Sequence, residues 1–375
     1  MTGPKVLPCV AALLVSALPI ATAATESVVF QSGDDGYHTY RIPAIVKAAN
    51  GDLLAFAEGR KHGGGDHGDI DLVLKRSADD GATWSDMQIV QDEWDDPAAK
   101  ITLGNPAPVV DKTDPAHPGR VWLPFTRDNK AVFVTFSDDH GATWSPRRDV
   151  SSTGMHPDWG WYATGPGHAL QLTRGPYAGR LIVASDHSLR GKKSWGAHVL
   201  LSDDHGATWR VGATDTRAAD AAIHPNENMA EELVDGRIYF HARDQHGSDP
   251  ATRAAAHSSD GGETYDAPFA PAPEFVTPVV QNSILRVAAV DRGDDENLLV
   301  WCGPGQADAR ADLTVRFSRD EGATWSEPVL IAKGPAAYSD LVLLDGPALG
   351  VLYEGGPTPY SQIVFRAWAC DKLSE

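Results

Sequence analysis

Apolar and polar residues alternate in short runs along most of this chain, and turn-forming residues separate the runs. Residues 71–76 (DLVLKR), 131–136 (AVFVTF) and 313–317 (LTVRF) are examples. Alternation of this kind is typical of half-buried β-strands. Pairs of runs flank Asn50-Gly51 and Asp235-Gly236, which are dipeptides favoured in tight hairpin turns. The pattern therefore predicts an all-β protein built from antiparallel hairpins.

One octapeptide, here called the box, recurs five times in the form S-x-D-x-G-x-T-W. The copies begin at Ser77, Ser137, Ser202, Ser258 and Ser318, and Tyr replaces Trp in the fourth. The distance along the chain between successive copies is that of a supersecondary repeat. In each copy the Asp can accept backbone N–H groups, the Gly can adopt a positive φ, and the Trp can pack beneath. We interpret the box as a structural turn, because it lacks the alternating ligands and distal Glu of a calcium loop.

Each box follows a predicted strand, and a second hairpin precedes that strand. Four antiparallel strands per repeat form the blade of a β-propeller. Five such units extend to about residue 333, and runs at residues 338–344, 348–354 and 362–368 begin a sixth. Residues 27–30 could supply its fourth strand and close the ring. We predict a single six-bladed β-propeller over residues 24–375, with four-stranded antiparallel blades and no accessory domain.

The N-terminal segment, residues 1–23, has the features of a secretory signal peptide. Lys5 precedes an apolar run at residues 10–20, and Ala21-Thr22-Ala23 resembles a cleavage site. The run is too short to span a membrane. We therefore expect cleavage near Ala23, a secreted protein and no membrane span.

The composition narrows the possible partners. Asp and Glu number 51 against 32 Lys and Arg, which gives a formal net charge of −19. Such a chain is poorly suited to nucleic acid or an anionic membrane surface. After removal of the signal segment only Cys302 and Cys370 remain, and a disulfide between them stays an open alternative. Two cysteines form no disulfide framework, so the hydrophobic core must stabilise the fold. We also expect the protein to be a monomer.

The predicted strand order brings a set of polar residues to one end of the propeller, which we call the top, with the boxes at the opposite end. Each of these residues alone is more typical of a solvated surface. Their shared position in several blades predicts a site, and four arginines among them indicate an anionic ligand. The set comprises Arg41, Arg60, Asp66, Asn105, Glu227, Arg243, Arg310, Tyr338 and Glu354.

The boxes, the Arg41-Ile-Pro43 triplet, the Gly-rich segment that ends at Asp66, and the spacings of the later top residues resemble the bacterial exo-alpha-sialidases (neuraminidases). The resemblance covers nearly the whole chain after residue 23. It implies three arginines that bind the carboxylate of sialic acid, an Asp as acid and base, a Tyr nucleophile and its Glu partner. These are, in the same order, Arg41, Arg243 and Arg310, then Asp66, Tyr338 and Glu227.

The resemblance also implies that Glu354 orients the first arginine, and that Arg60 and Asn105 lie near the sugar 4-hydroxyl. Some relatives carry Asp where this chain has Asn105. Trp159 and Trp161 are candidates to line the glycerol or aglycone side of the site.

These residue types suit the chemistry of sialic acid, which carries a carboxylate on its anomeric carbon. A carboxylate nucleophile would be repelled there, whereas a neutral tyrosine activated by a glutamate is not. Asp66 would protonate the leaving oxygen and then act as the base toward water. We predict a retaining exo-alpha-sialidase acting on sialylated glycans, glycoproteins or glycolipids, with no metal and no cofactor.

Two alternatives remain open on the sequence. A non-catalytic propeller lectin for acidic glycans would keep the arginines, but it would not need Asp66, Tyr338 and Glu227 together. An intramolecular trans-sialidase or a deaminated-sialic-acid hydrolase would keep the same site and differ only in acceptor or substrate.

Overall fold

The computed structural model describes residues 26–93, 100–247, 252–346 and 348–369. The predicted signal segment, residues 1–23, and Cys370 lie outside these ranges. Cys302, its candidate disulfide partner, is buried in β21.

The first two sheets hold four and five strands. The first follows the order β2 (Thr39–Lys47), β3 (Leu53–Arg60), β4 (Ile70–Ser77) and β5 (Gln88–Gln91). The second follows β10 (Arg148–Asp149), β9 (Ala131–Ser137), β8 (Arg120–Arg127) and β6 (Leu103–Gly104), and β7 (Val109–Asp111) also pairs with β8. One short helix follows the second sheet, α1 (Ser151–Gly154).

The third and fourth sheets continue the series. The third follows β11 (Trp159–Thr164), β13 (Leu181–Leu189), β14 (Ser194–Ser202) and β15 (Arg210–Ala218), with β12 (Leu170–Gln171) on β13. The fourth follows β16 (Pro225–Glu232), β17 (Ile238–Asp244), β18 (Arg253–Ser258) and β19 (Ala270–Pro271). Two 3₁₀ turns lie at Gly175–Tyr177 and Val290–Arg292.

The fifth sheet has seven strands, β20 (Ser283–Ala288), β21 (Leu298–Pro304), β22 (Ala311–Ser318), β23 (Val329–Leu343), β24 (Ala348–Gly355), β25 (Gln362–Ala369) and β1 (Glu26–Gln31). The first part of β23, up to Pro335, pairs with β22, and the part from Ala336 onward pairs with β24. One strand therefore ends one antiparallel set and begins the next.

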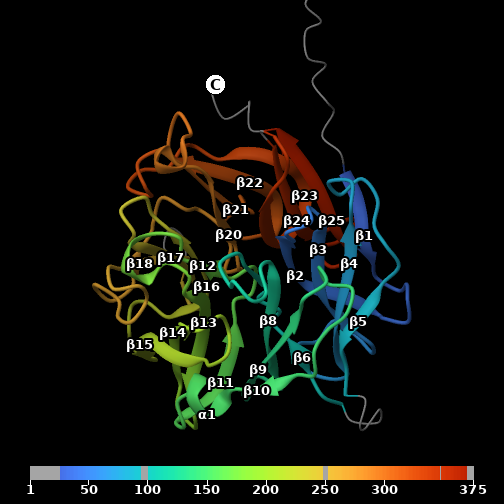
Figure 1. The fold of residues 1–375 in the computed structure, drawn as a ribbon, viewed down its shortest axis with the longest axis horizontal. Helices are drawn as coiled ribbons and strands as arrows, with labels where there is room; N and C mark the ends of the chain where they lie inside the picture. The colour runs from blue at the N-terminus through green and yellow to red at the C-terminus, as the bar shows by residue number, and fades with distance from the viewer. Residues whose placement is uncertain (1–25, 94–99, 248–251, 347, 370–375) are drawn as a thin grey trace, which may run out of the picture.

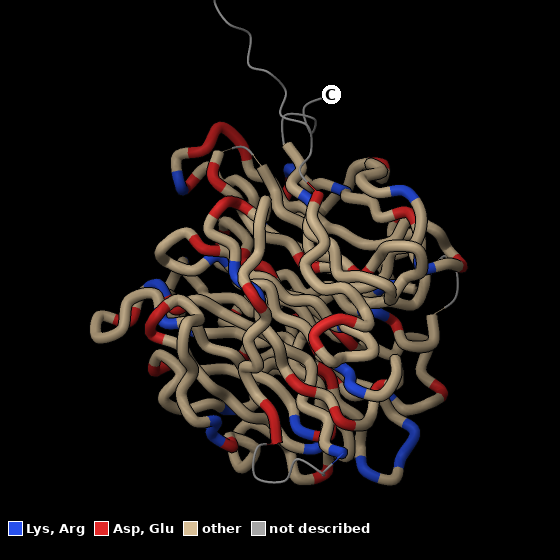
Figure 2. Tube along the Cα trace, turned by 90° about the vertical axis from the view of Figure 1, so that its right-hand side faces the viewer, with Lys and Arg blue, Asp and Glu red and all other residues tan. Residues whose placement is uncertain are grey.

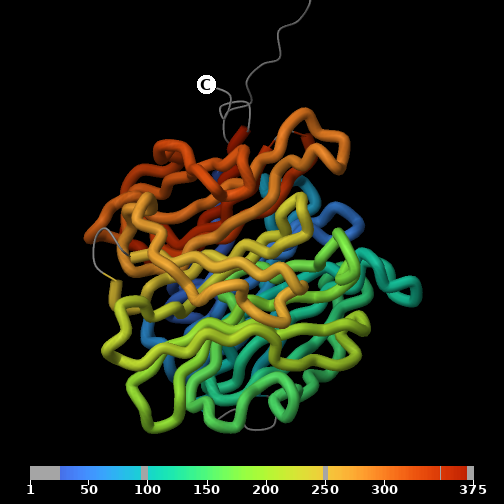
Figure 3. The backbone as a smooth tube through the Cα atoms, turned by 90° about the vertical axis from the view of Figure 1, so that its left-hand side faces the viewer, coloured from blue at the N-terminus to red at the C-terminus, as the bar shows by residue number. Residues whose placement is uncertain are grey.

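The sheets follow one another around a common centre, in a propeller-like, all-β arrangement. In Figure 1 the colour passes from blue through green and yellow to red around this centre, so the last strands return to the first. Figure 3 shows from the side how the successive sheets lie next to one another. No helix among the described residues is long and apolar enough to cross a bilayer.

The N-terminal strand closes the ring as predicted. β1 pairs antiparallel with β25, with Ser27 opposite Phe365 and Val28 opposite Val364. Val29 and Phe30 then join a core cluster that includes Phe365 and residues of the first sheet. Segments more than 330 residues apart in the chain are thus held together by backbone hydrogen bonds and apolar packing.

All five boxes are structural turns, which confirms the interpretation from sequence. In the third copy the Thr208 N–H and hydroxyl donate to Asp204 at 2.7 and 2.6 Å, and the Gly206 N–H donates to the Ser202 hydroxyl at 2.8 Å. The other four copies repeat these contacts. The Asp side chains therefore accept hydrogen bonds from donors of the turn itself.

The boxes also pack neighbouring sheets together. Trp209 of the third box is buried, and its ring lies 6.1 Å from that of Trp122 in the second sheet. Trp144 of the second box contacts Phe56 of the first sheet edge to face. Trp84 of the first box contacts Phe365 of β25 in the same way. These three boxes therefore add apolar contact with the sheet before them in the ring.

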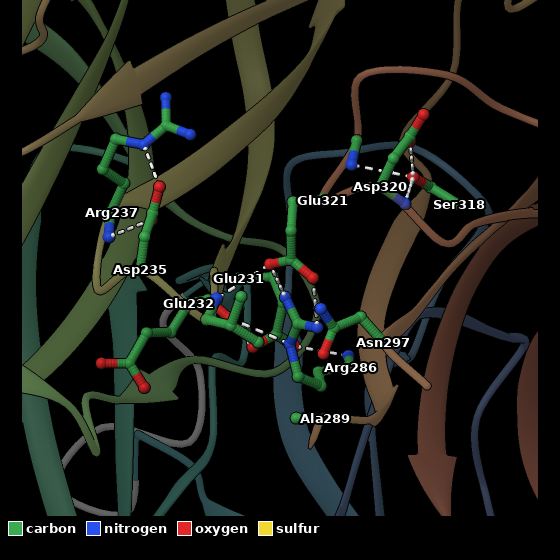
Figure 4. A network of polar contacts seen from close by, with 12 residues as sticks. Glu231, Glu232, Asp235, Arg237, Arg286, Ala289, Asn297, Ser318, Asp320 and Glu321 are labelled. Carbon is green, nitrogen blue, oxygen red and sulfur yellow. Dashed lines mark hydrogen bonds and ion pairs between the residues drawn. The ribbon is translucent and has the colours of Figure 1, made fainter. Parts of the chain in front are cut away.

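Figure 4 shows a polar version of this packing at the fifth box. Glu321 of that box accepts from both terminal nitrogens of Arg286 at 2.9 and 2.6 Å, and from the Val234 N–H at 2.8 Å. The Arg286 N–H in turn donates to Glu231 at 2.7 Å. The buried guanidinium is thereby paired, and the fourth and fifth sheets are joined.

Candidate active site

A cavity of about 540 Å³ contains eight of the nine site residues predicted from sequence. The ninth, Glu354, lies fully buried behind Arg41. No box residue lines this cavity. Figure 2 shows Asp and Glu positions interspersed with Lys and Arg positions over one side of the molecule, with no continuous basic face in view. The four arginines of the cavity are therefore a local concentration of basic residues, and they lie beside the carboxyl groups of Glu58, Asp66, Asp186 and Glu227.

Three of the site residues lie where the strand register is irregular. The pairing shifts after Arg41 in β2, around Glu227 in β16, and around Tyr338 in β23. Ile42, directly after Arg41, has a positive φ of 58°. Such bulges turn a side chain away from the alternation of a regular strand. The irregularities thus direct these residues into the cavity.

Arg41 is held by Glu354, as the resemblance implied. Its Nε and Nη2 atoms donate to the two Glu354 oxygens at 2.9 and 3.2 Å, and the Ile42 N–H donates to the same carboxylate at 2.9 Å. Burial alone would lower the pKa of Arg41, but the Glu354 charge raises it above the usual value. The guanidinium is therefore charged and fixed before any ligand arrives.

Tyr338, Glu227 and Arg243 form a connected group. The Tyr338 hydroxyl donates to Glu227 Oε1 at 2.5 Å, and Arg243 Nη1 donates to Glu227 Oε2 at 2.8 Å and to the Tyr338 hydroxyl at 3.1 Å. Burial and then the Glu227 charge raise the pKa of Tyr338, against a smaller opposing effect of the arginines. Tyr338 is therefore a neutral phenol, and its proton already points at a carboxylate.

Asp66 lies in the loop between β3 and β4, and its side chain is 68% exposed. Arg60 Nη1 donates to it at 2.8 Å and Arg41 Nη1 at 3.4 Å. Burial acts to raise the pKa of Asp66, but the Arg60 charge and hydrogen bond outweigh it and lower the pKa. Sequence reasoning required this residue to be protonated for its acid role. In the resting site, however, it is a carboxylate.

Arg60 and Asn105 both donate hydrogen bonds to Glu58, a residue that sequence reasoning missed. Glu58 is buried and accepts from Arg60 at 3.1 and 2.7 Å, and its other oxygen accepts from the Asn105 N–H at 2.9 Å. The Asn105 side chain donates to Thr126 at 3.1 Å. Glu58 stands two residues before Arg60 in β3, and this same-face spacing could have revealed it.

Arg310 is positioned differently from the other arginines. It lies between β21 and β22, where its Nη1 donates to the Tyr360 hydroxyl at 2.8 Å and its Nη2 to the Val279 carbonyl at 3.2 Å. Tyr360, in the loop between β24 and β25, also lines the cavity. Sequence reasoning missed Tyr360, because nothing in its local sequence distinguishes it from a surface tyrosine.

The cavity is also lined by Trp161 but not by Trp159. The indole N–H of Trp161 donates to Asp186 at 3.1 Å, and the Asn226 side chain donates to the same oxygen at 2.8 Å. Trp159 is 3% exposed and stacks on His187, so only one of the two candidate tryptophans is available to a ligand. Burial, and then the Glu227 charge, raise the pKa of Asp186 well above its usual value.

One acidic cluster among the described residues has the spacing of a metal site, formed by Asp69, Asp71 and Asp92. The Lys61 Nζ atom lies 2.9 Å from both Asp69 and Asp71. A lysine thus supplies the positive charge at this cluster. The cluster therefore gives no support for a metal site.

Comparison with known proteins agrees with the geometry. The chain matches the BNR repeat-like domain family over residues 51–351. It is 30% identical over 362 residues to the sialidase of Micromonospora viridifaciens, covering 88% of this chain and 52% of that protein. It is 31% identical over 372 residues to sialidase-2 of Mus musculus, covering 88% of this chain and 92% of that protein.

Among solved structures, Hadza microbial sialidase Hz136 has a TM-score of 0.80 and 25% identity, covering 92% of this chain and 69% of that one. This chain spans about half the length of the Micromonospora viridifaciens relative and nearly all of the Mus musculus relative. Taken with the five boxes and the tyrosine, glutamate and arginines of the cavity, these similarities show that the chain belongs to the sialidase family with BNR repeats.

Proposed function

We propose that this protein is a retaining exo-alpha-sialidase, in which Tyr338 is the nucleophile and Glu227 its general base. The observation that carries the proposal is the 2.5 Å hydrogen bond from the Tyr338 hydroxyl to Glu227. A carboxylate placed to receive the tyrosine proton is what a neutral phenol needs to attack a carbon. The three arginines proposed to bind the substrate carboxylate, Arg41, Arg243 and Arg310, line the same cavity.

In the first step the substrate carboxylate binds Arg41, Arg243 and Arg310. The Tyr338 oxygen attacks the anomeric carbon while its proton passes to Glu227. The bond to the leaving oxygen breaks, and that oxygen takes a proton from Asp66. The arginines hold the carboxylate as the ring flattens and positive charge develops. The product is a covalent glycosyl–tyrosine intermediate and the released aglycone.

In the second step Asp66 takes a proton from water, and the water oxygen attacks the anomeric carbon. The bond to Tyr338 breaks, and the tyrosine oxygen recovers its proton from Glu227. Both residues thus return to their starting states. Two inversions at one carbon give net retention.

Asp66 must gain a proton before the first step, because Arg60 and Arg41 hold it as a carboxylate in the resting site. A substrate carboxylate on Arg41 would offset part of that positive charge and add a negative charge nearby. Both effects favour the protonated form of Asp66. Substrate binding and protonation of the acid are therefore expected to be coupled.

Glu354 fixes Arg41, and Arg60 and Asn105 lie on the side of the sugar 4-hydroxyl. The substrates are sialylated glycans, glycoproteins or glycolipids. The protein acts as a secreted monomer after removal of residues 1–23, with no nucleic-acid partner.

We further propose that residues 24–375 form one domain, a six-bladed propeller. The seven-stranded sheet then counts as two blades, because β23 changes its partner from β22 to β24 between Pro335 and Ala336. The first of these blades is β20 to β23, and the second is completed by β24, β25 and β1. Together with the other four sheets, these two blades give six blades.

The test is an assay of the purified protein on a fluorogenic sialoside, followed by NMR of the released sugar. We expect turnover, with the α-anomer appearing first. The β-anomer as first product would reject the retaining mechanism. Binding of a sialoside without turnover would support the lectin, and transfer to a hydroxyl of the same sugar would support an intramolecular trans-sialidase.

A further inference from the structure

We propose that Tyr360 is a positioning residue for two of the three carboxylate-binding arginines, and that it links their geometry to the strand that closes the ring. This inference rests on the proposed function of the cavity. Tyr360 lies in the loop between β24 and β25, remote in sequence from Arg41 and Arg310, the two arginines that it contacts.

The first observation is the unusual environment of Arg310. Arg41 is paired with Glu354, and Arg243 is paired with Glu227. Arg310 has no carboxylate partner in the part of the chain that the structure describes. Its two recorded acceptors are the Tyr360 hydroxyl and the Val279 carbonyl, and both are neutral.

A neutral acceptor fixes the direction of a guanidinium without cancelling its charge. Arg310 is therefore the arginine with the most uncompensated charge available to an incoming carboxylate. Within the described residues the Tyr360 hydroxyl is its only side-chain hydrogen-bond acceptor. Loss of that oxygen should leave the Arg310 guanidinium held by the Val279 carbonyl and the Tyr338 ring 5.5 Å away, and therefore less restricted in its rotamers. The same loss would not change the pairing of Arg41 or Arg243.

The second observation is that the Tyr360 ring also contacts Arg41. The centre of the Arg41 guanidinium lies 4.4 Å from the Tyr360 ring centroid and 5.0 Å from that of Tyr338. Such distances are typical of cation–π contacts. Glu354 holds Arg41 by hydrogen bonds, and the Tyr360 ring supports it through a face contact.

The third observation is how the loop itself is fixed. The Tyr360 carbonyl accepts from the Ser32 hydroxyl at 2.9 Å. The Ser32 N–H donates to the Ser361 carbonyl at 3.0 Å, and the Gln31 side chain donates to the same carbonyl at 3.3 Å. Ser32 directly follows β1, so closure of the ring by β1 fixes the backbone that presents Tyr360.

These contacts predict a specific kinetic signature. The carboxylate is bound both before and during the reaction, so a misdirected Arg310 weakens both states by a similar amount. When the substrate complex and the transition state lose the same binding free energy, KM rises and kcat stays nearly unchanged. A nucleophile or acid variant would instead lower kcat.

The test compares Tyr360→Phe, Tyr360→Leu and Ser32→Ala with wild type, using a fluorogenic sialoside. Tyr360→Phe keeps the ring beneath Arg41, and we expect it to raise KM about tenfold with kcat within about threefold of wild type. Tyr360→Leu removes both contacts and should raise KM further. Ser32→Ala should give a smaller rise in the same direction.

Tyr177→Phe is the matched control, because Tyr177 also lies against an arginine, with the Arg180 guanidinium 4.5 Å from its ring, and it does not line the cavity. We expect it to match wild type. A double variant with Arg310→Lys adds a second readout. If Tyr360 acts through Arg310, removing the hydroxyl should have little additional effect once the guanidinium is gone.

The outcomes separate this inference from the proposed function. Wild-type turnover tests the function, and the KM ratio of Tyr360→Phe to wild type tests the inference. An unchanged KM in Tyr360→Phe, or a fall in kcat without a rise in KM, would overturn the role of Tyr360 and leave the sialidase proposal intact. Absence of both turnover and sialic acid binding in wild type would overturn both proposals.

Discussion

At the scale of single residues, the site combines a neutral phenol, the proposed nucleophile, with guanidinium groups that are fixed in place. Burial keeps the Tyr338 proton in place, and Glu227 accepts its hydrogen bond and would receive this proton in the proposed mechanism. The arginines remain charged and are held by other residues of the protein. Little reorganisation is then needed as charge develops in the transition state, which is how preorganised sites accelerate reactions.

Replacing Tyr338 by Phe should remove the nucleophile and leave the arginines in place. We expect the rate to fall on the order of a hundredfold or more, because the covalent route is lost. Steady-state kinetics measures the loss, and calorimetry with a transition-state-like inhibitor should show much better retained binding. Near-normal turnover with retained configuration would contradict the assignment.

Replacing Asp66 by Ala should have an effect that depends on the leaving group. A natural glycoside needs the proton, so its rate should fall by about a hundredfold or more, whereas an activated phenol should be affected much less. The two substrates are compared in the same kinetic assay. Equal losses on both would mean that Asp66 is not the acid.

The pH dependence of the wild-type enzyme follows from the ionised state of Asp66. Its pKa in the free enzyme is lowered by Arg60, so the protonated fraction falls as pH rises through the acidic range. For a natural glycoside, kcat/KM should therefore decrease with rising pH, and for an activated phenol this decrease should be weaker. A decrease of the same size for both substrates would assign it to another group.

At the scale of elements, the box both forms a turn and packs on the preceding sheet. Gly206 has a φ of 81°, and a Cβ there would lie 2.2 Å from the Trp122 ring. The glycine is therefore required twice, by backbone conformation and by close contact with the neighbouring sheet. The positive φ recurs at this Gly in all five boxes, between 81° and 87°, so the backbone conformation explains the repeated Gly, and the close contact is an additional constraint at Gly206.

Gly206→Ala should accordingly destabilise more than a glycine substitution in an open turn. Gly236 is the matched control, because its φ is 85° but a Cβ there would meet nothing closer than 3.9 Å. We expect a loss of about 2 to 4 kcal/mol for Gly206→Ala and about 1 kcal/mol for Gly236→Ala. Urea unfolding measures both, and equal losses would show that the contact with Trp122 does not matter.

At the scale of the whole molecule, the pair formed by Asp340 and His168 joins several sheets. Asp340 of β23 accepts from the Ile45 N–H of β2 at 2.8 Å and from the His168 N–H at 2.9 Å. The His168 ring Nδ1 atom lies 2.7 Å from the other Asp340 oxygen. Asp340 is fully buried. Its carboxylate therefore connects three parts of the ring, which are β23, β2 and the segment that contains His168.

This pair should make stability depend on pH. Burial acts to lower the pKa of His168, but the Asp340 charge, with a contribution from Glu231, raises it above the usual value. A raised folded-state pKa adds stability that is complete below the unfolded-state pKa of about 6.5 and is lost as pH rises through the folded-state pKa. Urea unfolding from pH 6 to pH 9 should show this decline, and His168→Asn should remove it. A His168→Asn variant with the same pH dependence as wild type would contradict the prediction.

Much of this organisation could be predicted from residue patterns, because its causes are local. Alternation of apolar and polar residues predicts the strands, since a strand presents alternate side chains to the core. The box predicts its own turn, since its Asp, Gly and Thr bond within a few residues of one another. Pairing of residues 27–30 with the last strand was also correctly predicted, because the closing blade lacked one strand.

Only the tertiary structure determined the contacts inside the cavity. The register shifts at Arg41, Glu227 and Tyr338 turn their side chains inward, and such bulges depend on the partner strand. The Tyr360 contact with Arg310, the burial of Trp159 and the ionised state of Asp66 likewise depend on groups brought together by folding. The sequence by itself determined which residues reach the top of the ring. Their partners, directions and charge states were decided by the packing of sheets that lie far apart along the chain.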